Sequence, residues 1–456
     1  MRNRAKKIAE TIRKAQEIHI VTHIDADGVT AGAIAASTLE RIDKTFSIQF
    51  VKQLDNNILY KLEREQHELV WFTDIGSSVA DYEKVNKVIT DHHVCTRDKD
   101  YVFHLNPHLF GLDGSTEISG AGVTYLVAKE LCQDCIDLTY LAIVGACGDL
   151  QDVKQCKLQG LNRKILEEGE RAGVLKKQID IRYFGRETRP VYKLLQFATD
   201  PLIPGLTGRE DACISFLNEY NIPLKDGDNW RRWIDLKLEE KRKIVSEIMK
   251  LLLVKGFGYK IAARVLGEVY ILTKEDEGTE LHDAKEFATM LNATARYGES
   301  EVGLNVCLGD RDKWFKKARN LLRNHRQNLV NGLQLARDEG IVERKFLQYF
   351  HAGEGIKDTI VGIVTGMMLS SGEVNTNLPL IGFANTENGD VKVSARARRE
   401  LADKGLNLSV AMQNAAEALN GVGGGHNVAA GATIPKGKEE EFLEILEKEI
   451  KNQLNL

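Results

Sequence analysis

Carboxylate and imidazole side chains gather at four places in the first third of the chain, and each group follows a largely apolar run. Two divalent cations roughly 3.5–4 Å apart need a shared carboxylate, several further Asp or His ligands, and open positions for water and substrate. Such a donor set suits manganese or magnesium better than a metal bound by thiolates, and manganese is the metal we prefer. The residues of this predicted two-metal site are His23, Asp25, Asp27, Asp74, Asp91, His92, His93 and Asp149.

The apolar runs before these residues are typical of buried strands in a parallel sheet. Open α/β sheets bind ligands outside the carboxyl ends of their strands, so residues far apart in the sequence can converge there. Gly28 permits a sharp turn, and the pattern over residues 29–40 indicates a helix after it. We therefore predict an α/β fold with a doubly wound parallel sheet. The predicted strands cover residues 18–22, 69–73, 85–90 and 141–147.

The spacing of the acidic residues suggests how they are used. Asp74 stands alone at the end of a predicted strand and is the natural bridge between two metals. If the chain is extended from His23 to Asp27, alternation places His23, Asp25 and Asp27 on one face. Each motif alone has an ordinary explanation, since Asp-x-Asp-Gly is common in turns and Asp-His-His can begin a helix. Their combination, each after an apolar run, favours the metal site.

A second group of candidate residues lies near the other end of the chain. Successive glycines let backbone N–H groups approach phosphate oxygens, and a histidine adds a further donor. Alternation along residues 391–398 puts Ser394, Arg396 and Arg398 on one face, where Arg396 is the preferred phosphate clamp and Arg398 the second. The alternative is a plain loop between a helix at 408–419 and a strand at 429–434. The glycine-rich residues are Gly423, Gly424, Gly425, His426 and Asn427.

Length and composition indicate a large globular protein. The chain has 456 residues and a formal net charge of −4, and this length predicts two or three domains. The charge lacks the global basic character of many nucleic-acid binders, although a nuclease can confine a positive field to a groove. Seven cysteines without a disulfide pattern indicate a reducing compartment. Because neither a signal peptide nor a membrane-spanning stretch stands out, we expect a cytoplasmic protein that does not enter the membrane.

Together, the His-x-Asp-x-Asp-Gly, isolated Asp, Asp-His-His and Gly-Asp series resembles the DHH phosphoesterase superfamily. The glycine run after residues 391–396 independently resembles the C-terminal domain that accompanies DHH domains. Residues 21–33, 145–152 and 185–190 are most similar to the archaeal RecJ-like nucleases. These N-terminal and C-terminal matches lie near the two ends of the chain, so the resemblance spans nearly its whole length.

The resemblance implies a role for each candidate residue. One metal is held by His23, Asp25 and Asp74. Asp91 orients an imidazole, and His93 faces the scissile phosphate. Three arginines of one short loop are expected to meet a backbone phosphate, while Asp152 matches an acidic position of the archaeal branch without an assigned role. The ligands of the second metal are Asp27, Asp74, His92 and Asp149, and the loop arginines are Arg182, Arg186 and Arg189.

Shifts in composition divide the chain into four parts. We expect a DHH catalytic domain at 1–180, an interposed α-rich or α+β domain at 181–300, a helical connector at 301–340, and a smaller α/β DHH-associated substrate-binding domain at 341–456. The substrate groove should lie between the two ends of the chain. The resemblance implies that the interposed region contacts the GINS complex of the replicative helicase.

The leading functional prediction is an exonuclease that needs manganese or magnesium and releases mononucleotides from single-stranded DNA or RNA in replication or repair. One alternative is a replisome scaffold that binds GINS and the helicase with weak or no catalysis. The retained ligands argue against that alternative. Another is a phosphodiesterase of short oligonucleotides or cyclic dinucleotides. The interposed domain argues against it, because minimal versions of the family need only the two terminal domains.

Overall fold

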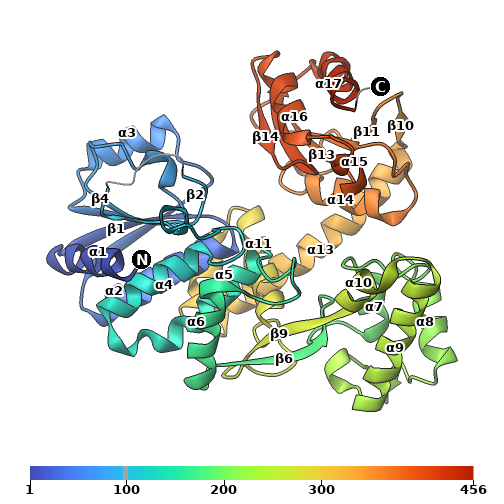
Figure 1. The fold of residues 1–456 in the computed structure, drawn as a ribbon, viewed down its shortest axis with the longest axis horizontal. Helices are drawn as coiled ribbons and strands as arrows, with labels where there is room; N and C mark the ends of the chain where they lie inside the picture. Colours follow the sequence, from blue (N-terminus) through green and yellow to red (C-terminus); the bar gives the residue numbers. More distant parts are fainter. Residues whose placement is uncertain (96–100, 455–456) are drawn as a thin grey trace. The chain divides into compact units, whose positions relative to one another are not determined.

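The computed structural model describes residues 1–95 and 101–454 and divides the chain into two compact units (Figure 1). The first unit is Met1–Leu322 and the second is Arg323–Leu456. Each unit has a sheet of its own and separate hydrophobic cores. Among the helices of the described residues, none is long and apolar enough to cross a membrane.

The first unit is built around a five-stranded sheet in which every neighbouring pair is parallel, with the strand order β2-β1-β3-β4-β5. The central strands β3 and β4 are buried along their whole length, because apolar side chains cover both faces of the sheet. This arrangement confirms the predicted α/β fold. The strands are β1 (Glu17–His23), β2 (Thr45–Val51), β3 (Leu69–Thr73), β4 (Lys87–Thr90) and β5 (His104–Leu105).

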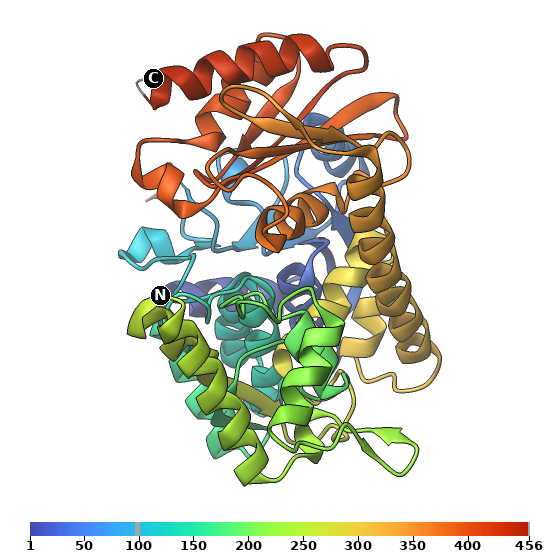
Figure 2. The same ribbon diagram turned by 90° about the vertical axis from the view of Figure 1, so that its right-hand side faces the viewer.

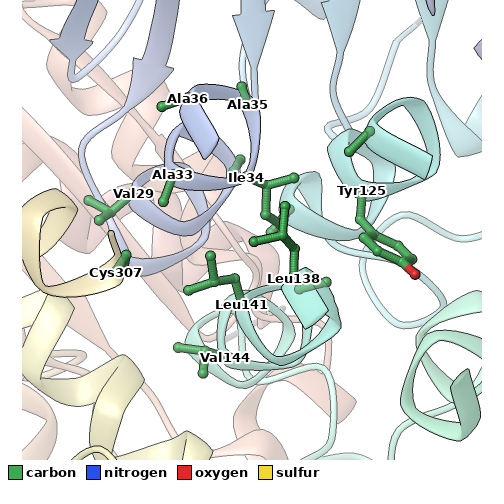
Figure 3. Close-up of a cluster of buried hydrophobic side chains, with 14 of the residues drawn as sticks. Val29, Ala33, Ile34, Ala35, Ala36, Tyr125, Leu138, Leu141, Val144 and Cys307 are labelled. Carbon is green, nitrogen blue, oxygen red and sulfur yellow. The ribbon is translucent and has the colours of Figure 1, made fainter. Parts of the chain in front are cut away.

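Helices pack on both faces of this sheet. On one face, Ile18, Ile20 and Trp71 join the larger core, which side chains of α2, α5 and the end of α12 (Ser300–Cys307) help to fill (Figure 3). On the other face, Phe72 and Ile89 pack with apolar residues of α3. The helices of this region are α1 (Arg2–Lys14), α2 (Ala26–Arg41), α3 (Asn56–Glu65), α4 (Gly120–Leu131), α5 (Thr139–Gly148) and α6 (Gly160–Arg171).

Residues 141–147 were predicted as a strand, but they form most of helix α5, so this prediction was wrong. The helix is apolar on all sides because it is enclosed by other helices, and its side chains from Leu141 to Cys147 are buried. A short apolar run without polar residues has no period that separates a buried strand from a buried helix. Residues 23–27 are not extended either, since β1 ends at His23 and α2 begins at Ala26.

A helical bundle is inserted into the first unit through a two-stranded antiparallel ribbon (Figure 1). The chain leaves along β6 (Leu175–Ile181) and returns along β9 (Leu266–Leu272). The bundle has its own core, in which Trp233 is fully buried. We call this segment the inserted bundle. Its helices are α7 (Val191–Gln196), α8 (Glu210–Glu219), α9 (Leu238–Val254) and α10 (Gly258–Ala262).

After β9 the chain returns to the core of the first unit. Helices α11 (Ala284–Arg296) and α12 (Ser300–Cys307) place Phe287, Leu291 and Val302 in the same core as the parallel sheet. The end of the stretch expected to be interposed, 181–300, therefore packs with the DHH-like part. The long helix α13 (Lys313–Glu339) then runs across the boundary between the two units.

The second unit contains a six-stranded sheet with the order β10-β11-β12-β13-β15-β14 (Figure 2). Its side chains alternate between two cores: Leu380 packs with α14, whereas Val393 and Ala395 pack with α16 and α17. The glycines at 423–425 form the edge strand β14 rather than a loop. The strands are β10 (Val342–Glu343), β11 (Gln348–His351), β12 (Leu380–Asn385), β13 (Asp390–Arg396), β14 (Val422–Gly425) and β15 (Ala429–Pro435). The helices are α14 (Val361–Ser371), α15 (Arg399–Asp403), α16 (Leu408–Glu417) and α17 (Glu439–Gln453).

Candidate metal centre

The turn between β1 and α2 positions the first three candidate ligands. His23 is the last residue of β1, and the Asp25 carboxylate caps α2 by accepting a hydrogen bond from Gly28 N (3.0 Å). Asp27 lies in the first turn of α2 and is fully buried. Its two carboxylate oxygens accept hydrogen bonds from Gly120 N (2.6 Å) and Ala121 N (3.0 Å) at the start of α4. A helix N-terminus therefore holds this anion in place.

Asp74 follows β3 in a backbone conformation that is uncommon for a residue other than glycine. Its φ is +56°, and its N–H donates to Thr90 O of the neighbouring strand (2.8 Å). Non-glycine residues in this conformation cluster at functional sites, because surrounding contacts must hold them there. Gly120 packs directly against the carboxylate, since a Cβ at position 120 would lie 2.3 Å from Asp74 Oδ1. Only glycine fits at this close approach.

Asp91 fixes the orientation of His93 after β4. Its Oδ1 accepts from the backbone N–H of His92 (2.7 Å) and from His93 Nδ1 (2.8 Å), and its Oδ2 accepts from Ser77 N (2.9 Å). Burial alone would raise the pKa of Asp91, but the hydrogen bond and positive charge of His93 hold it well below its usual value. The side chain of His93 is 56% exposed. Its free ring edge is therefore accessible to a substrate.

His92 presents its other ring nitrogen to the carboxylates. Its Nδ1 donates to the carbonyl oxygen of Gly114 (2.7 Å), since a carbonyl can only accept. Nε2 then lies 3.1 Å from Asp149 Oδ2, 3.2 Å from Asp74 Oδ1 and 3.7 Å from Asp27 Oδ2. A histidine that donates through one nitrogen and offers the other is the usual arrangement of a metal ligand.

The predicted ligands come together in two groups that share one neighbourhood. Within each group, one ligand atom per residue lies within 4.8 Å of the others. Asp74 belongs to the first group through its Oδ2, which is 3.7 Å from His23 Nδ1, and it approaches the second group through Oδ1. This position suits a bridging carboxylate. The groups are His23, Asp25 and Asp74, and Asp27, His92 and Asp149; a third group, which overlaps both, is Asp74, His92 and His93.

The donor set fits two divalent cations. Among the buried side-chain atoms of the described residues that have no hydrogen-bond partner of acceptable geometry, three belong to this site: His23 Nδ1, Asp74 Oδ1 and His92 Nε2. Burial and the neighbouring Asp149 raise the pKa of Asp27 to about 7, and burial and Asp27 raise the pKa of Asp74 well above its usual value. Carboxylates buried this closely need a compensating positive charge. Bound cations would supply that charge and also satisfy the unpartnered atoms.

In the second unit, the candidate phosphate-binding residues lie along one end of the sheet. Arg396 pairs with Ala429 in the register of β13 and β15, and Ala397 N donates to Val428 O (2.9 Å). The arginine segment therefore runs directly beside the turn that carries His426 and Asn427, which follow β14. Ser394 is buried on the face that packs with α14. The predicted alternation of side chains between two strand faces ends earlier than residue 398, because β13 stops at Arg396. Arg398 is instead the exposed N-cap residue of α15.

The loop arginines of the first unit are engaged within the protein. Arg186 is buried, and its guanidinium lies 2.8 Å from Asp283 Oδ2 and 3.3 Å from Asp180 Oδ2, which leaves it poorly placed to meet a phosphate. Arg189 lies over the rings of Phe184 and Phe197.

Asp152, to which the sequence assigned no role, forms a buried ion pair. Its Oδ2 lies 3.2 Å from Arg182 Nη2 and 2.9 Å from Lys285 Nζ. Because α11 carries Lys285 and the chain entering the inserted bundle carries Arg182, this carboxylate ties the two segments together.

Sequence reasoning missed several residues that shape the metal centre. Asn292 of α11 accepts a hydrogen bond from Ala26 N (3.0 Å), and Gly114 O orients His92. No sequence signal connects Asn292 with a turn more than 260 positions earlier. The start of α4 could have been noticed, because Ser119 followed by small residues is typical of a helix N-terminus that receives an anion.

Three family models match the chain in order. The DHH family N-terminal domain matches residues 17–143, the DHH-CID domain residues 183–265, and the DHHA1 domain residues 344–452. The uncharacterized protein MJ0831 of Methanocaldococcus jannaschii is 34% identical over 447 residues, which cover 96% of this chain and 94% of that protein. The chain therefore belongs to the DHH family.

Solved structures share its fold. RecJ in complex with Mn²⁺ from Thermus thermophilus matches with a TM-score of 0.60 and 18% identity over 99% of this chain. The chain spans about half of that relative, 54% of its length. CDC45 from Entamoeba histolytica matches with a TM-score of 0.64 and 13% identity over 99% of this chain and 97% of that chain. The protein is thus a member of the DHH family with a RecJ-like fold, and its family and clustered ligands support a metal-dependent phosphoesterase.

Proposed function

We propose that the protein is a two-metal phosphodiester hydrolase, a RecJ-like exonuclease that releases mononucleotides from single-stranded DNA or RNA. The observation that carries this proposal is the convergence of five Asp and His side chains around Asp74, whose two oxygens face different ligand groups. Three ligand atoms of this cluster are buried without a hydrogen-bond partner, and bound cations would satisfy them.

The ligands divide into two sets with Asp74 in both. His23, Asp25 and Asp74 would hold one ion, and Asp27, Asp74, His92 and Asp149 the other, with Mn²⁺ preferred over Mg²⁺. Bound together, two such ions make a water acidic enough to supply hydroxide near neutral pH and stabilise charge on a phosphodiester. Gly114 O accepts a hydrogen bond from His92 Nδ1, so the other ring nitrogen, Nε2, is left to bind a metal.

His93 is placed to transfer a proton. The hydrogen bond to Asp91 raises the pKa of His93, although burial works against this, so the imidazole favours its protonated form. With Nδ1 held by Asp91, the exposed Nε2 can donate a proton to the leaving oxygen of a phosphodiester. Asp91 is a positioning residue in this scheme, and His93 is the catalytic acid.

The second unit would hold the rest of the strand through its phosphates. Arg396 and Arg398 supply positive charge, and β14 brings backbone N–H groups without side chains to obstruct them. Sequence-independent contacts of this kind suit an enzyme that degrades a strand stepwise. The other residues proposed for this surface are Ser394, Gly423, Gly424, Gly425, His426 and Asn427.

A replisome scaffold is the second candidate function. The likeness to CDC45 over 97% of that chain favours it, and the inserted bundle would then dock on GINS or the helicase. The complete ligand set argues for catalysis in addition to any such docking. A phosphodiesterase of short oligonucleotides or cyclic dinucleotides would leave the inserted bundle without a purpose.

Digestion of matched single-stranded DNA and RNA, each labelled separately at either end, tests the proposal in the presence of Mn²⁺. We expect stepwise release of mononucleotides by the wild type and a loss of rate on the order of a thousandfold for Asp74→Ala, because both ligand groups lose a member. Asp211→Ala, at an exposed aspartate of α8, is the matched control and should retain the wild-type rate. Equal rates for wild type and Asp74→Ala would refute the two-metal assignment.

A further inference from the structure

A cavity of about 430 Å³ lies within the first unit, where the inserted bundle meets the end of α5 and one side of α11. Its volume falls in the range of pockets that hold small ligands. Lining residues come from residues 147–153, from the entrance and exit of the inserted bundle, and from α11. The phosphate chemistry described above does not use this space.

The cavity shares a wall with the candidate metal centre. Gly148 lines it and directly precedes Asp149, and a Cβ at position 148 would lie 2.7 Å from the Cβ of Ala26. Asn292 also lines it, and its Oδ1 accepts the hydrogen bond from Ala26 N. Ala26 stands between two predicted metal ligands, so a molecule in the cavity would lie next to the metal-binding turn.

The charged residues of the cavity are largely neutralised by one another. Lys285 and Arg182 both pair with the buried Asp152, and Arg264 makes two hydrogen bonds to Asp200 (2.9 and 2.6 Å). These three cationic side chains face two carboxylates, so the wall of the cavity carries only a small net positive charge. Such a wall is rigid and polar, and it suits a nearly neutral group better than a bare phosphate.

The remaining lining groups match the parts of a nucleoside. Thr289 and Asn292 lie three residues apart on one face of α11. The Thr289 hydroxyl donates to Lys285 O (2.8 Å) and keeps acceptor capacity, while Asn292, which accepts through Oδ1, offers its Nδ2 as a donor. Phe184 contributes an aromatic ring; Arg189 lies over one face of this ring, so a base would stack on the opposite face. Together these residues supply a donor, an acceptor and a stacking surface.

We infer that this cavity binds the nucleoside of the terminal nucleotide, the one that is released as a mononucleotide, with its phosphate toward the metal-binding turn. This inference rests on the proposed function and adds a subsite to it. A mononucleotide should therefore bind better than its phosphate alone, because the cavity holds the base and the sugar.

Isothermal titration of the full chain in Mn²⁺ with adenosine 5′-monophosphate, adenosine and inorganic phosphate tests the inference. We expect the mononucleotide to bind at least tenfold more tightly than phosphate to the wild type. Thr289→Phe fills the cavity and should abolish this preference while leaving phosphate affinity unchanged. Thr11→Phe is the matched control, because Thr11 of α1 is also a half-buried helical threonine whose hydroxyl donates to the carbonyl four residues earlier (3.1 Å).

Phe184→Leu provides a second variant in case Thr289→Phe does not fold. It retains an apolar side chain but removes the stacking surface, and it should weaken the mononucleotide about tenfold and phosphate not at all. Unchanged mononucleotide affinity in both folded variants would overturn the inference, as would a wild type that prefers phosphate. The digestion assay distinguishes this inference from the proposed function. If the variants lose mononucleotide binding but the wild type cleaves no strand, the cavity is a nucleotide-binding site and the nuclease proposal is wrong.

Discussion

Gly120 controls how closely α4 approaches the metal centre. Its N–H donates to Asp27 Oδ2, and a Cβ there would lie 2.3 Å from Asp74 Oδ1, 2.6 Å from Asp74 Cβ and 2.7 Å from its Cγ. Gly120→Ala should therefore push the Asp74 carboxylate out of position and lower Mn²⁺ affinity about tenfold or more. Alanine is favourable early in a helix, so the fold should survive. Titration of Mn²⁺ into the metal-stripped protein measures the affinity.

The matched control for this change is Gly366→Ala in α14. A Cβ at position 366 would meet its nearest neighbour, Arg396 Nε, at an ordinary distance of 3.7 Å. This variant should bind Mn²⁺ like the wild type. If Gly120→Ala binds Mn²⁺ with unchanged affinity, the close approach has no role in shaping the site.

Residue types and spacing were enough to propose the metal ligands, because each ligand follows a recognisable apolar run. Two partners that orient those ligands could not be predicted, since Gly114 and Asn292 approach the metal-binding residues only in the folded chain. The same limit explains Arg186. A basic residue in a short loop resembles a phosphate contact, and nothing in its local sequence reveals the buried carboxylates of Asp180 and Asp283 that surround it.

At the level of elements, strands β1, β3 and β4 were predictable because their apolar runs are short and rich in β-branched or aromatic residues. Helix α5 was not, since enclosure by other helices removes the polar side that gives a helix its period. Strand β2 was also missed. It mixes exposed and half-buried residues, as expected for a strand at the edge of the sheet.

The junction between the inserted bundle and α11 contains a carboxyl group that should make stability depend on pH. Burial and the nearby Asp283 raise the pKa of Glu286 to about 7, above the 4.5 of an unperturbed glutamate. Because the folded state then favours the protonated form, the stability that this group contributes below pH 4.5 is lost as the pH rises toward 7. Glu286→Gln mimics the protonated form and should remove this loss, so the variant should exceed the wild type by up to about 3 kcal/mol at pH 7.5.

Urea unfolding followed by tryptophan fluorescence measures this difference. All four tryptophans, Trp71, Trp230, Trp233 and Trp314, lie in the first unit, so the signal reports that unit alone. At pH 5 the difference in free energy of unfolding between the wild type and Glu286→Gln should fall to about 1 kcal/mol or less. Glu301→Gln, at an exposed glutamate of α12, serves as the control. A constant difference between wild type and Glu286→Gln from pH 5 to 7.5 would show that Glu286 does not titrate in this range.

At the level of the whole molecule, the candidate metal ligands all belong to the first unit and the candidate phosphate-binding edge belongs to the second. The sequence indicated both regions from their separate motifs. It could not show that the middle of the chain is an insertion, because the return of α11 and α12 to the first core leaves no mark in composition. The pairing of β6 with β9, about ninety residues apart, appears only in the fold.

This division predicts that chemistry and strand binding can be separated by mutation. Arg396→Ala removes a cation from the edge beside the glycine strand, so it should raise the KM for a single-stranded oligonucleotide about tenfold. Hydrolysis of bis(p-nitrophenyl) phosphate, which is too small to need the second unit, should keep its wild-type kcat/KM. Steady-state kinetics on the two substrates in Mn²⁺ measure both effects.

Lys448→Ala is the control for loss of one positive charge, because Lys448 is an exposed cation of α17 in the same unit. Its KM for the oligonucleotide should stay at the wild-type value, since its charge is not part of the proposed phosphate-binding edge. Parallel losses on both substrates in Arg396→Ala would mean that the arginine supports the fold or the metal centre. Unchanged kinetics on both would move the phosphate contact to Arg398 or to the backbone of β14, the remaining donors on that edge.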